Sequence, residues 1–329
     1  AVAVICGHLR RWVMRNQDWP NMRFSPPLSA PKLVESGSSG AGSDSGRSAL
    51  ADSHVDGFVA YYFAMANYVG KLPSSHFVDY LRFSHSAATA AAPTTLDLAK
   101  VRNIEHVDSF PLEPLAKALQ LSKIFDGIEM VGVVRAGVLS AVAQAIALHN
   151  STIKRLRLVG CGATATGAAH LATALSTNTT IGITSLDLSR NDLKDEAMLA
   201  LVAGIRSSSA RLRSLRLNKC GLTHRSVAAL CYAFADDSDL AKKLRVLELS
   251  DNDIGAVGSH ALASWLDTTT NTTTPLLLTH LSLEHSGVDV LKLVAVVVVV
   301  MAAFGDFDSR SNTHVPVSST STSSTTSLR

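Results

Sequence analysis

The sequence predicts an α/β solenoid, in which strands and helices alternate in a stack of similar repeats. One pattern occurs five times, beginning at Ile153, Ile183, Leu212, Leu244 and Leu278, so that the starts lie 29 to 34 residues apart. Repeats of this length form a stack in which each unit buries its apolar face against its neighbours. The composition agrees, because 47% of the residues are hydrophobic and only 5% are aromatic, which suits a core of aliphatic layers.

Each repeat begins with a strand. In ITSLDLSRND, the alternation of a strand directs Leu186 and Leu188 into the core and Asp187 outward. The third residue after the second strand leucine is small in every repeat, and we term this place the turn position. It holds Cys161, Asn191, Cys220, Asn252 and Ser286. We expect these side chains to hydrogen-bond backbone groups left unpaired where the strand ends.

A helix follows each strand. Fifteen residues after the first strand leucine, the repeats carry an apolar residue within a helical pattern: Leu171, Leu201, Leu230, Leu262 and Val296. In the last repeat this spacing assigns the valine-rich run 293–304 to the helix. A membrane-spanning helix needs about 20 apolar residues, so this twelve-residue run is too short and we predict no membrane span.

The composition divides the chain into four segments. Residues 1–54 are rich in Pro, Ser and Gly and are predicted to be disordered or flexible. Residues 55–93 carry aromatic residues at helical spacing and are predicted to form a helical N-terminal cap and a linker. Residues 94–304 form the repeat domain, with about two degenerate repeats before the five clear ones from residue 153. Residues 305–329 are predicted to be a disordered Ser/Thr-rich tail.

The strand pattern L-x-x-L-x-L-x-x-N/C, followed by a full helix, resembles the ribonuclease-inhibitor type of leucine-rich repeat. The alternation of Cys161, Asn191, Cys220 and Asn252 at the turn position is similar to that subclass. The resemblance covers about two thirds of the chain. It implies an intracellular horseshoe, with parallel strands on the concave face and helices on the convex face. The family includes enzyme inhibitors, immune sensors, actin-filament cappers, axonemal subunits and the activating protein of the Ran GTPase, so it specifies the fold rather than the function.

The outward strand positions form columns across the concave face. The middle column reads Arg157, Asp187, Arg216, Glu248 and Ser282, and the flanking column reads Lys154, Thr184, Arg213, Arg245 and Thr279. The charges of the middle column either neutralise one another or meet a partner. Arg213 and Arg245 should be neighbours without an acid between them in their column, which makes them a candidate anchor for an acidic patch. The predicted partner-binding residues are Lys154, Arg155, Arg157, Arg190, Arg213, Arg216, Arg245, Glu248 and Glu284.

These features predict a non-catalytic scaffold or adaptor that binds a protein partner with an acidic patch. We expect no catalytic residue, metal or cofactor, because the sequence has no phosphate loop, no H-E-x-x-H motif and no paired cysteines at zinc-ligand spacing. The net charge of +3 is too small to indicate nucleic acid. Two alternatives stay open. One is a structural subunit of an axonemal, cytoskeletal or mitochondrial assembly, and the other is a GTPase activator similar to the Ran regulator, whose acidic tail this chain lacks.

The expected location is the cytoplasm, with a cytoskeletal or mitochondrial association left open. Turn-position thiols suit a reducing compartment. The first 23 residues hold four arginines, Arg10, Arg11, Arg15 and Arg23, against the single acid Asp18. Such a composition is typical both of a mitochondrial transit segment and of a basic tail.

Overall fold

The computed structural model describes residues 45–288, apart from 87–93, 108, 149, 179, 181, 208–211, 237–242 and 271–277. The chain divides into two units, residues 1–50 and 51–329, and the sheet lies in the second. Three of the predicted segments fall outside the described residues: most of the N-terminal segment 1–54, the valine-rich run 293–304 and the tail 305–329.

A seven-stranded parallel sheet runs through the second unit, and its strand order follows the sequence. The strands are β1 (Thr94–Asp97), β2 (Phe125–Val131), β3 (Arg155–Val159), β4 (Ser185–Asp187), β5 (Ser214–Arg216), β6 (Val246–Glu248) and β7 (His280–Ser282). The first two lie where the degenerate repeats were expected. From β3 to β7 the central strand leucines pair in register: Leu156, Leu186, Leu215, Leu247 and Leu281. The repeat pattern therefore gives one strand per unit.

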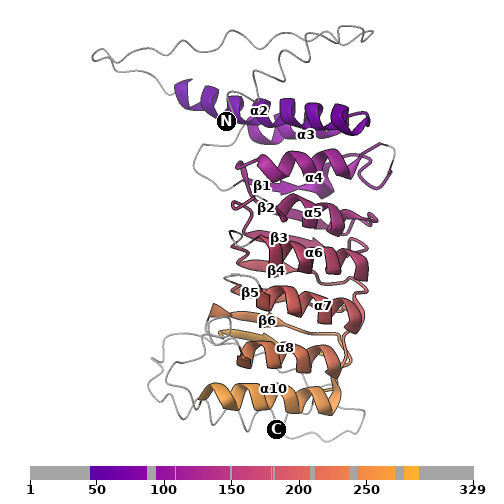
Figure 1. Cartoon of the computed structure of the whole chain (residues 1–329), viewed down its shortest axis with the longest axis vertical. Helices are drawn as coiled ribbons and strands as arrows, with labels where there is room; N and C mark the ends of the chain where they lie inside the picture. Colours follow the sequence, from indigo (N-terminus) through magenta and orange to yellow (C-terminus); the bar gives the residue numbers. More distant parts are fainter. Residues whose placement is uncertain are drawn as a thin grey trace, which may run out of the picture. The chain divides into compact units, whose positions relative to one another are not determined.

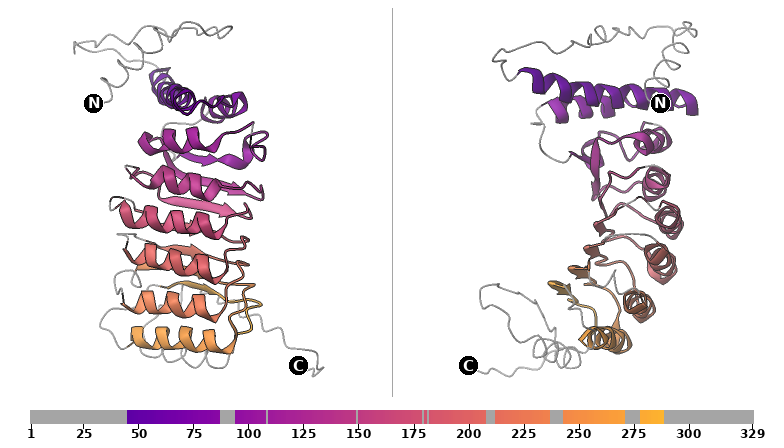
Figure 2. Two further views of the ribbon diagram at one scale, coloured as in Figure 1. Left: turned by 45° about the vertical axis from the view of Figure 1, so that its right-hand side comes forward. Right: turned by 60° about the vertical axis from the view of Figure 1, so that its left-hand side comes forward.

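The helices form a second layer on one side of this sheet (Figures 1 and 2). They are α4 (Leu112–Leu121), α5 (Val138–Ile146), α6 (Ala165–Thr177), α7 (Lys194–Ser207), α8 (His224–Asp236) and α10 (Gly255–Thr270). The predicted helix leucines Leu171, Leu201, Leu230 and Leu262 are buried between the two layers. Small residues let neighbouring helices approach closely, since a Cβ added to Gly204 would lie 2.5 Å from the Cα of Ala172. The predicted α/β leucine-rich repeat solenoid is confirmed.

Two further helices precede the sheet, α2 (Ser45–Val69) and α3 (Ser75–Ser86). Helix α2 begins before residue 55, inside the segment that the composition predicts to be flexible. Ser and Ala in this stretch permit a helix, and continuity with the packed part of α2 extends it.

Aromatic rings join these two helices to the first repeats. The ring centroids of Phe58 in α2 and Phe125 in β2 are 5.1 Å apart, and those of Phe77 in α3 and Phe110 are 5.3 Å apart. Both pairs meet edge to face, the arrangement that aromatic quadrupoles favour. Most of the buried aromatic residues thus gather at the end of the array next to α2 and α3, whereas the described repeats are packed mainly with aliphatic side chains, apart from Phe234 and Trp265.

Candidate partner-binding surface

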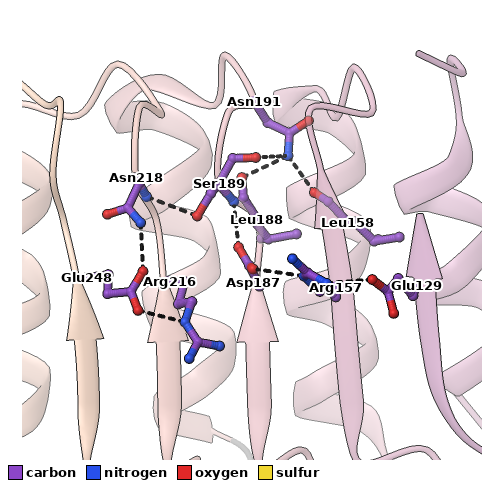
Figure 3. A network of polar contacts seen from close by, with 10 residues as sticks. All are labelled: Glu129, Arg157, Leu158, Asp187, Leu188, Ser189, Asn191, Arg216, Asn218 and Glu248. Carbon is purple, nitrogen blue, oxygen red and sulfur yellow. Dashed lines mark hydrogen bonds and ion pairs between the residues drawn. The ribbon is translucent and has the colours of Figure 1, made fainter. Parts of the chain in front are cut away.

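The turn position connects neighbouring repeats through side-chain amides. The Oδ1 atom of Asn191 accepts hydrogen bonds from the backbone N–H groups of Cys161 and Ala163, at 3.1 and 3.0 Å. Its Nδ2 group donates to the carbonyl oxygens of Leu158 and Leu188, both at 2.7 Å (Figure 3). One asparagine therefore satisfies four backbone groups in two repeats, at the point where the short strands end.

Asn252 and Ser286 take related roles further along the array. Asn252 accepts from the N–H groups of Cys220 and Leu222, at 3.0 and 3.1 Å. The hydroxyl of Ser286 donates to the carbonyl oxygen of Leu249 at 3.1 Å. The turn position is thus a structural column rather than a surface for a partner.

The cysteines of the described repeats are buried and carry free thiols. Burial raises the pKa of the Cys161 thiol to about 11, and the pKa values of Cys220 and Cys231 to about 12. The thiol of Cys220 donates to the carbonyl oxygen of Leu188 at 3.3 Å. A nucleophilic cysteine needs a lowered pKa and access to a substrate, so these three thiols have the properties of core residues.

Both arginines of the middle column on the concave face are held in ion pairs with carboxylates of the same column. The Nη1 atom of Arg157 lies 2.6 Å from a carboxylate oxygen of Glu129, and its Nε atom lies 3.6 Å from Asp187. The Nε atom of Arg216 lies 2.7 Å from Glu248 (Figure 3). Of the two interpretations of this column, the geometry favours mutual neutralisation. Glu129 lies in a degenerate repeat, so the sequence pattern did not place it here.

Asp187 is less exposed than its outward strand position suggests. The strand alternation predicts an outward carboxylate, but the residue is only 6% exposed. Its Oδ1 atom accepts a hydrogen bond from the backbone N–H of Ser189 at 3.1 Å, while Arg157 covers it from the neighbouring strand. The carboxylate therefore stabilises the end of its own strand and is not presented to a partner.

A polar column next to the middle one was missed by the sequence reasoning. The hydroxyl of Ser189 accepts from the N–H of Asn218 at 3.2 Å, and the side chain of Asn218 accepts from the N–H of Ser250 at 2.9 Å. Ser250 in turn accepts from the N–H of Glu284 at 3.1 Å. The sequence pattern that could have revealed this column is a Ser or Asn directly after the second strand leucine in three successive repeats. Side-chain oxygens here continue the pairing of strands that are only three residues long.

Arg155 also pairs within the sheet. Its Nη2 atom lies 2.7 Å from a carboxylate oxygen of Asp126 and donates to the hydroxyl of Thr95 at 3.0 Å. Both partners belong to the degenerate repeats. Arg155 therefore links β1, β2 and β3, and its charge is already neutralised by Asp126.

The flanking column carries cations of a different kind. The backbone N–H of Arg245 donates to the carbonyl of Arg213 at 2.8 Å, so these residues are neighbours as the register predicted. Their side chains and that of Lys154 are exposed, and none has a carboxylate within 4 Å among the residues that the structure describes. Arg190, at the opposite edge of the sheet with a φ of 60°, is likewise exposed and without an ion pair in this part of the chain.

Two histidines lie near the acidic end of the face but do not converge. The Nε2 atom of His280 is 4.0 Å from Glu248, whereas the Nδ1 atom of His285 is 3.3 Å from Asp251. Within the described ranges, no group of three or more His, Cys, Asp or Glu residues could hold a metal ion. No helix in the same ranges has the length and apolar character needed to cross a bilayer.

Comparison with known proteins supports the repeat assignment. The family model described as "Leucine Rich repeat" matches residues 183–202 and 241–263. NACHT, LRR and PYD domains-containing protein 3 of Rattus norvegicus is 36% identical over 106 residues, which are 32% of this chain and 10% of that protein. Ribonuclease inhibitor of Mus musculus is 33% identical over 114 residues, which are 35% of this chain and 24% of the inhibitor.

A third relative is Protein CARMIL of Dictyostelium discoideum, which is 30% identical over 117 residues, or 36% of this chain and 11% of that protein. The chain thus matches between about a tenth and a quarter of the length of these relatives. The matched stretch, the parallel sheet and the Asn/Cys turn position agree with one another. These findings support leucine-rich repeats of the ribonuclease-inhibitor type in this chain.

Proposed function

We propose that this chain is a non-catalytic scaffold that binds a protein partner through the concave face, the outward surface of strands β1 to β7. One observation carries the proposal. Arg213 and Arg245 are adjacent and exposed, and no carboxylate of the described residues pairs with either of them. Two neighbouring unneutralised cations attract an acidic patch and set its orientation.

Eight of the nine predicted contact residues fall into two groups under this proposal. Lys154, Arg190, Arg213 and Arg245 are the ones available to a partner. Arg155, Arg157, Arg216 and Glu248 hold neighbouring strands together through ion pairs of 2.6 to 2.7 Å. Glu284, whose backbone N–H binds Ser250, lies at the acidic end of the face.

The non-catalytic part of the proposal has separate support. The three buried thiols have raised pKa values, which is the opposite of what a nucleophile needs. One relative is named for inhibiting an enzyme, which is a binding role. We also propose an intracellular location, because free buried thiols suit a reducing compartment.

The test is capture of a partner by the full chain with both arginines reversed, Arg213→Glu together with Arg245→Glu. The matched control reverses two arginines on helices α7 and α8, Arg206→Glu together with Arg225→Glu, and gives the same change in net charge. We expect the first variant to lose the partner and the control to retain it, with both giving the circular dichroism of the parent. Equal capture by all three proteins would refute binding at the concave face.

The same preparation separates the remaining alternatives. Native mass spectrometry of the complex distinguishes a one-to-one adaptor from a subunit with fixed places for several neighbours. A GTP hydrolysis assay with the captured partner tests the GTPase-activator alternative, and an accelerated turnover would replace the scaffold proposal.

A further inference from the structure

A second pair of exposed cations lies at the other edge of the sheet. It consists of Arg190 and Lys219. The backbone N–H of Arg190 donates to the carbonyl of Asn218 at 2.7 Å. Because Asn218 directly precedes Lys219, the two cations occupy adjacent repeats. Both have φ near +60° (60° and 54°), the left-handed turn that ends each short strand. Neither has a carboxylate within 4 Å in the part of the chain that the structure describes.

We call Arg213 and Arg245 the N-edge pair, and Arg190 and Lys219 the C-edge pair. The two pairs overlap in a single repeat, the one that contains β5, since Arg213 precedes this strand and Lys219 follows it. Lys219 lies six positions after Arg213, a stretch that spans at most about 20 Å. The line that joins the two pairs therefore runs along β5 and not from repeat to repeat.

In the repeats on either side, the residues next to each pair are uncharged or acidic, so each cationic site is limited to two repeats. Beside the N-edge pair the column continues with Thr184 and Thr279, whose hydroxyls donate to the carbonyl oxygens of Lys154 and Arg245 at 3.2 and 3.0 Å. Beside the C-edge pair the next repeat carries Asp251, whose carboxylate is 3.3 Å from His285. An anion that followed the curve of the sheet would thus leave the cations after two repeats.

The middle of the face disfavours a continuous polyanion. In register, the middle column is Asp97, Glu129, Arg157, Asp187, Arg216, Glu248 and Ser282, which is four carboxylates against two guanidinium groups. Arg216 is bound to Glu248 at 2.7 Å, and Glu248 also accepts from Asn218 at 2.7 Å. A ligand with negative charge at both ends and neutral residues between them fits this pattern, whereas an unbroken phosphate backbone would meet the carboxylates.

We propose that the concave face recognises an extended acidic segment of a protein partner that lies along β5, with one acidic residue at the N-edge pair and another about six residues away at the C-edge pair. An even separation directs both acidic side chains of an extended segment to the same face. Each acid then lies between two cations of adjacent repeats, which are about 4.8 Å apart. This inference rests on the proposed function and adds the chemistry and direction of the bound segment.

The test uses the full chain and three synthetic Ser/Thr/Gly peptides, each with two glutamates separated by three, six or nine residues. Binding is measured by calorimetry at low ionic strength. We expect the six-residue spacing to bind about tenfold more tightly than the other two, since only it reaches both pairs. Arg213→Glu and Lys219→Glu should each remove this preference, while Arg225→Glu on helix α8 should keep it.

Three outcomes would overturn the inference. Equal affinity for all three spacings would do so, as would a spacing preference that survives Lys219→Glu. A single-stranded oligonucleotide that binds more tightly than the peptides would point to a nucleic-acid ligand instead. If the peptides show no preference but the Arg213→Glu and Arg245→Glu variant still loses its partner, the inference fails and the proposed function stands. Retained capture by that variant would contradict both.

Discussion

Asn191 shows how much of the repeat depends on a single side chain. It is 2% exposed and binds two N–H groups and two carbonyl oxygens that belong to two repeats. Asn252 repeats the arrangement around Cys220. A side chain with both a donor and an acceptor is needed here, which is why cysteine and serine at the same position make fewer of these bonds.

Asn191→Ala should lower the free energy of unfolding by about 3 kcal/mol, because buried backbone groups lose their partners. Urea unfolding at pH 7 measures this difference. The control is Asp192→Ala at the next, exposed position, which should change stability by less than about 0.5 kcal/mol. Similar effects of the two substitutions would contradict the bridging role of Asn191.

The three buried thiols give a second prediction about single residues. With pKa values of about 11 to 12, only about a thousandth or less of each thiol is ionised at pH 8. In a Cys6→Ser variant of the full chain, a disulfide reagent should therefore modify Cys161, Cys220 and Cys231 only as fast as the protein unfolds. Rapid labelling of the native variant would show that at least one of these cysteines is accessible and reactive.

Two further asparagines show what the repeat pattern does not reveal. Asn150 and Asn178 are each 2% exposed, and their amides donate to the carbonyl oxygens of Leu119 and Ile146 at 2.7 and 2.6 Å. Both stand in N-x-Ser/Thr sequences, yet their side chains are enclosed in the fold. They join the ends of helices α4 and α5 to the segments that precede β3 and β4, a role that lies outside the strand motif.

At the scale of elements, neighbouring helices are connected by a shared cap. The carboxylate of Asp195, in the first turn of α7, accepts from the N–H of Thr223 at 2.9 Å and from the hydroxyls of Thr223 and Ser226. Burial disfavours its charge, but the hydrogen bonds from Ser226 and Thr223 outweigh this and lower the pKa of Asp195. Asp195 therefore caps the beginning of the following helix, α8, as an anion.

Asp195→Asn should cost about 1 kcal/mol of stability at pH 7, a typical value for a lost charged cap. Because the folded pKa lies below the unfolded value of about 3.9, the stabilisation is complete above that pH and is lost as the pH falls through the folded pKa. The difference between the parent and the variant should thus narrow below about pH 4. Urea unfolding over this range measures it, with exposed Asp192→Asn as the control, and a constant difference would contradict the cap.

The aromatic contacts of helix α3 give another prediction at the scale of elements. Phe77 is fully buried against Tyr62 and Phe110, so Phe77→Ala should lower the free energy of unfolding by about 3 to 5 kcal/mol. Phe83 lies on the same helix, α3, but is 84% exposed, and Phe83→Ala should have a much smaller effect. Chemical denaturation compares the two. Equal losses would show that α3 does not cover the first repeats through Phe77.

The sequence predicted repeated features better than irregular ones. The leucine periodicity determined the sheet, the helix layer and the adjacency of Arg213 and Arg245, because each column is a fixed offset in every repeat. It did not predict the pairing of Arg157 with Glu129, since Glu129 lies in a repeat whose motif is degenerate. The burial of Asp187 was also missed, because alternation gives the side of the sheet but not the local hydrogen bonds.

Across the whole molecule, the concave face separates two kinds of charge. Arg155, Arg157 and Arg216 are each held by a carboxylate at 2.6 to 2.7 Å and stabilise the sheet. The four cations Arg190, Arg213, Lys219 and Arg245, which have no carboxylate within 4 Å among the described residues, lie toward the two edges of the same sheet. The scaffold can therefore bind anions at its edges without breaking the ion pairs between its strands.

Cross-linking of the purified complex with an amine-reactive reagent, followed by mass spectrometry, tests this account most directly. Lys154 directly precedes β3 and Lys219 follows β5, and both are exposed, whereas Lys117 belongs to helix α4. We predict that links to the partner arise from Lys154 and Lys219 and disappear with Arg213→Glu and Arg245→Glu. Links that arise instead from Lys117 would show that the partner binds the helical face and would contradict the central claim.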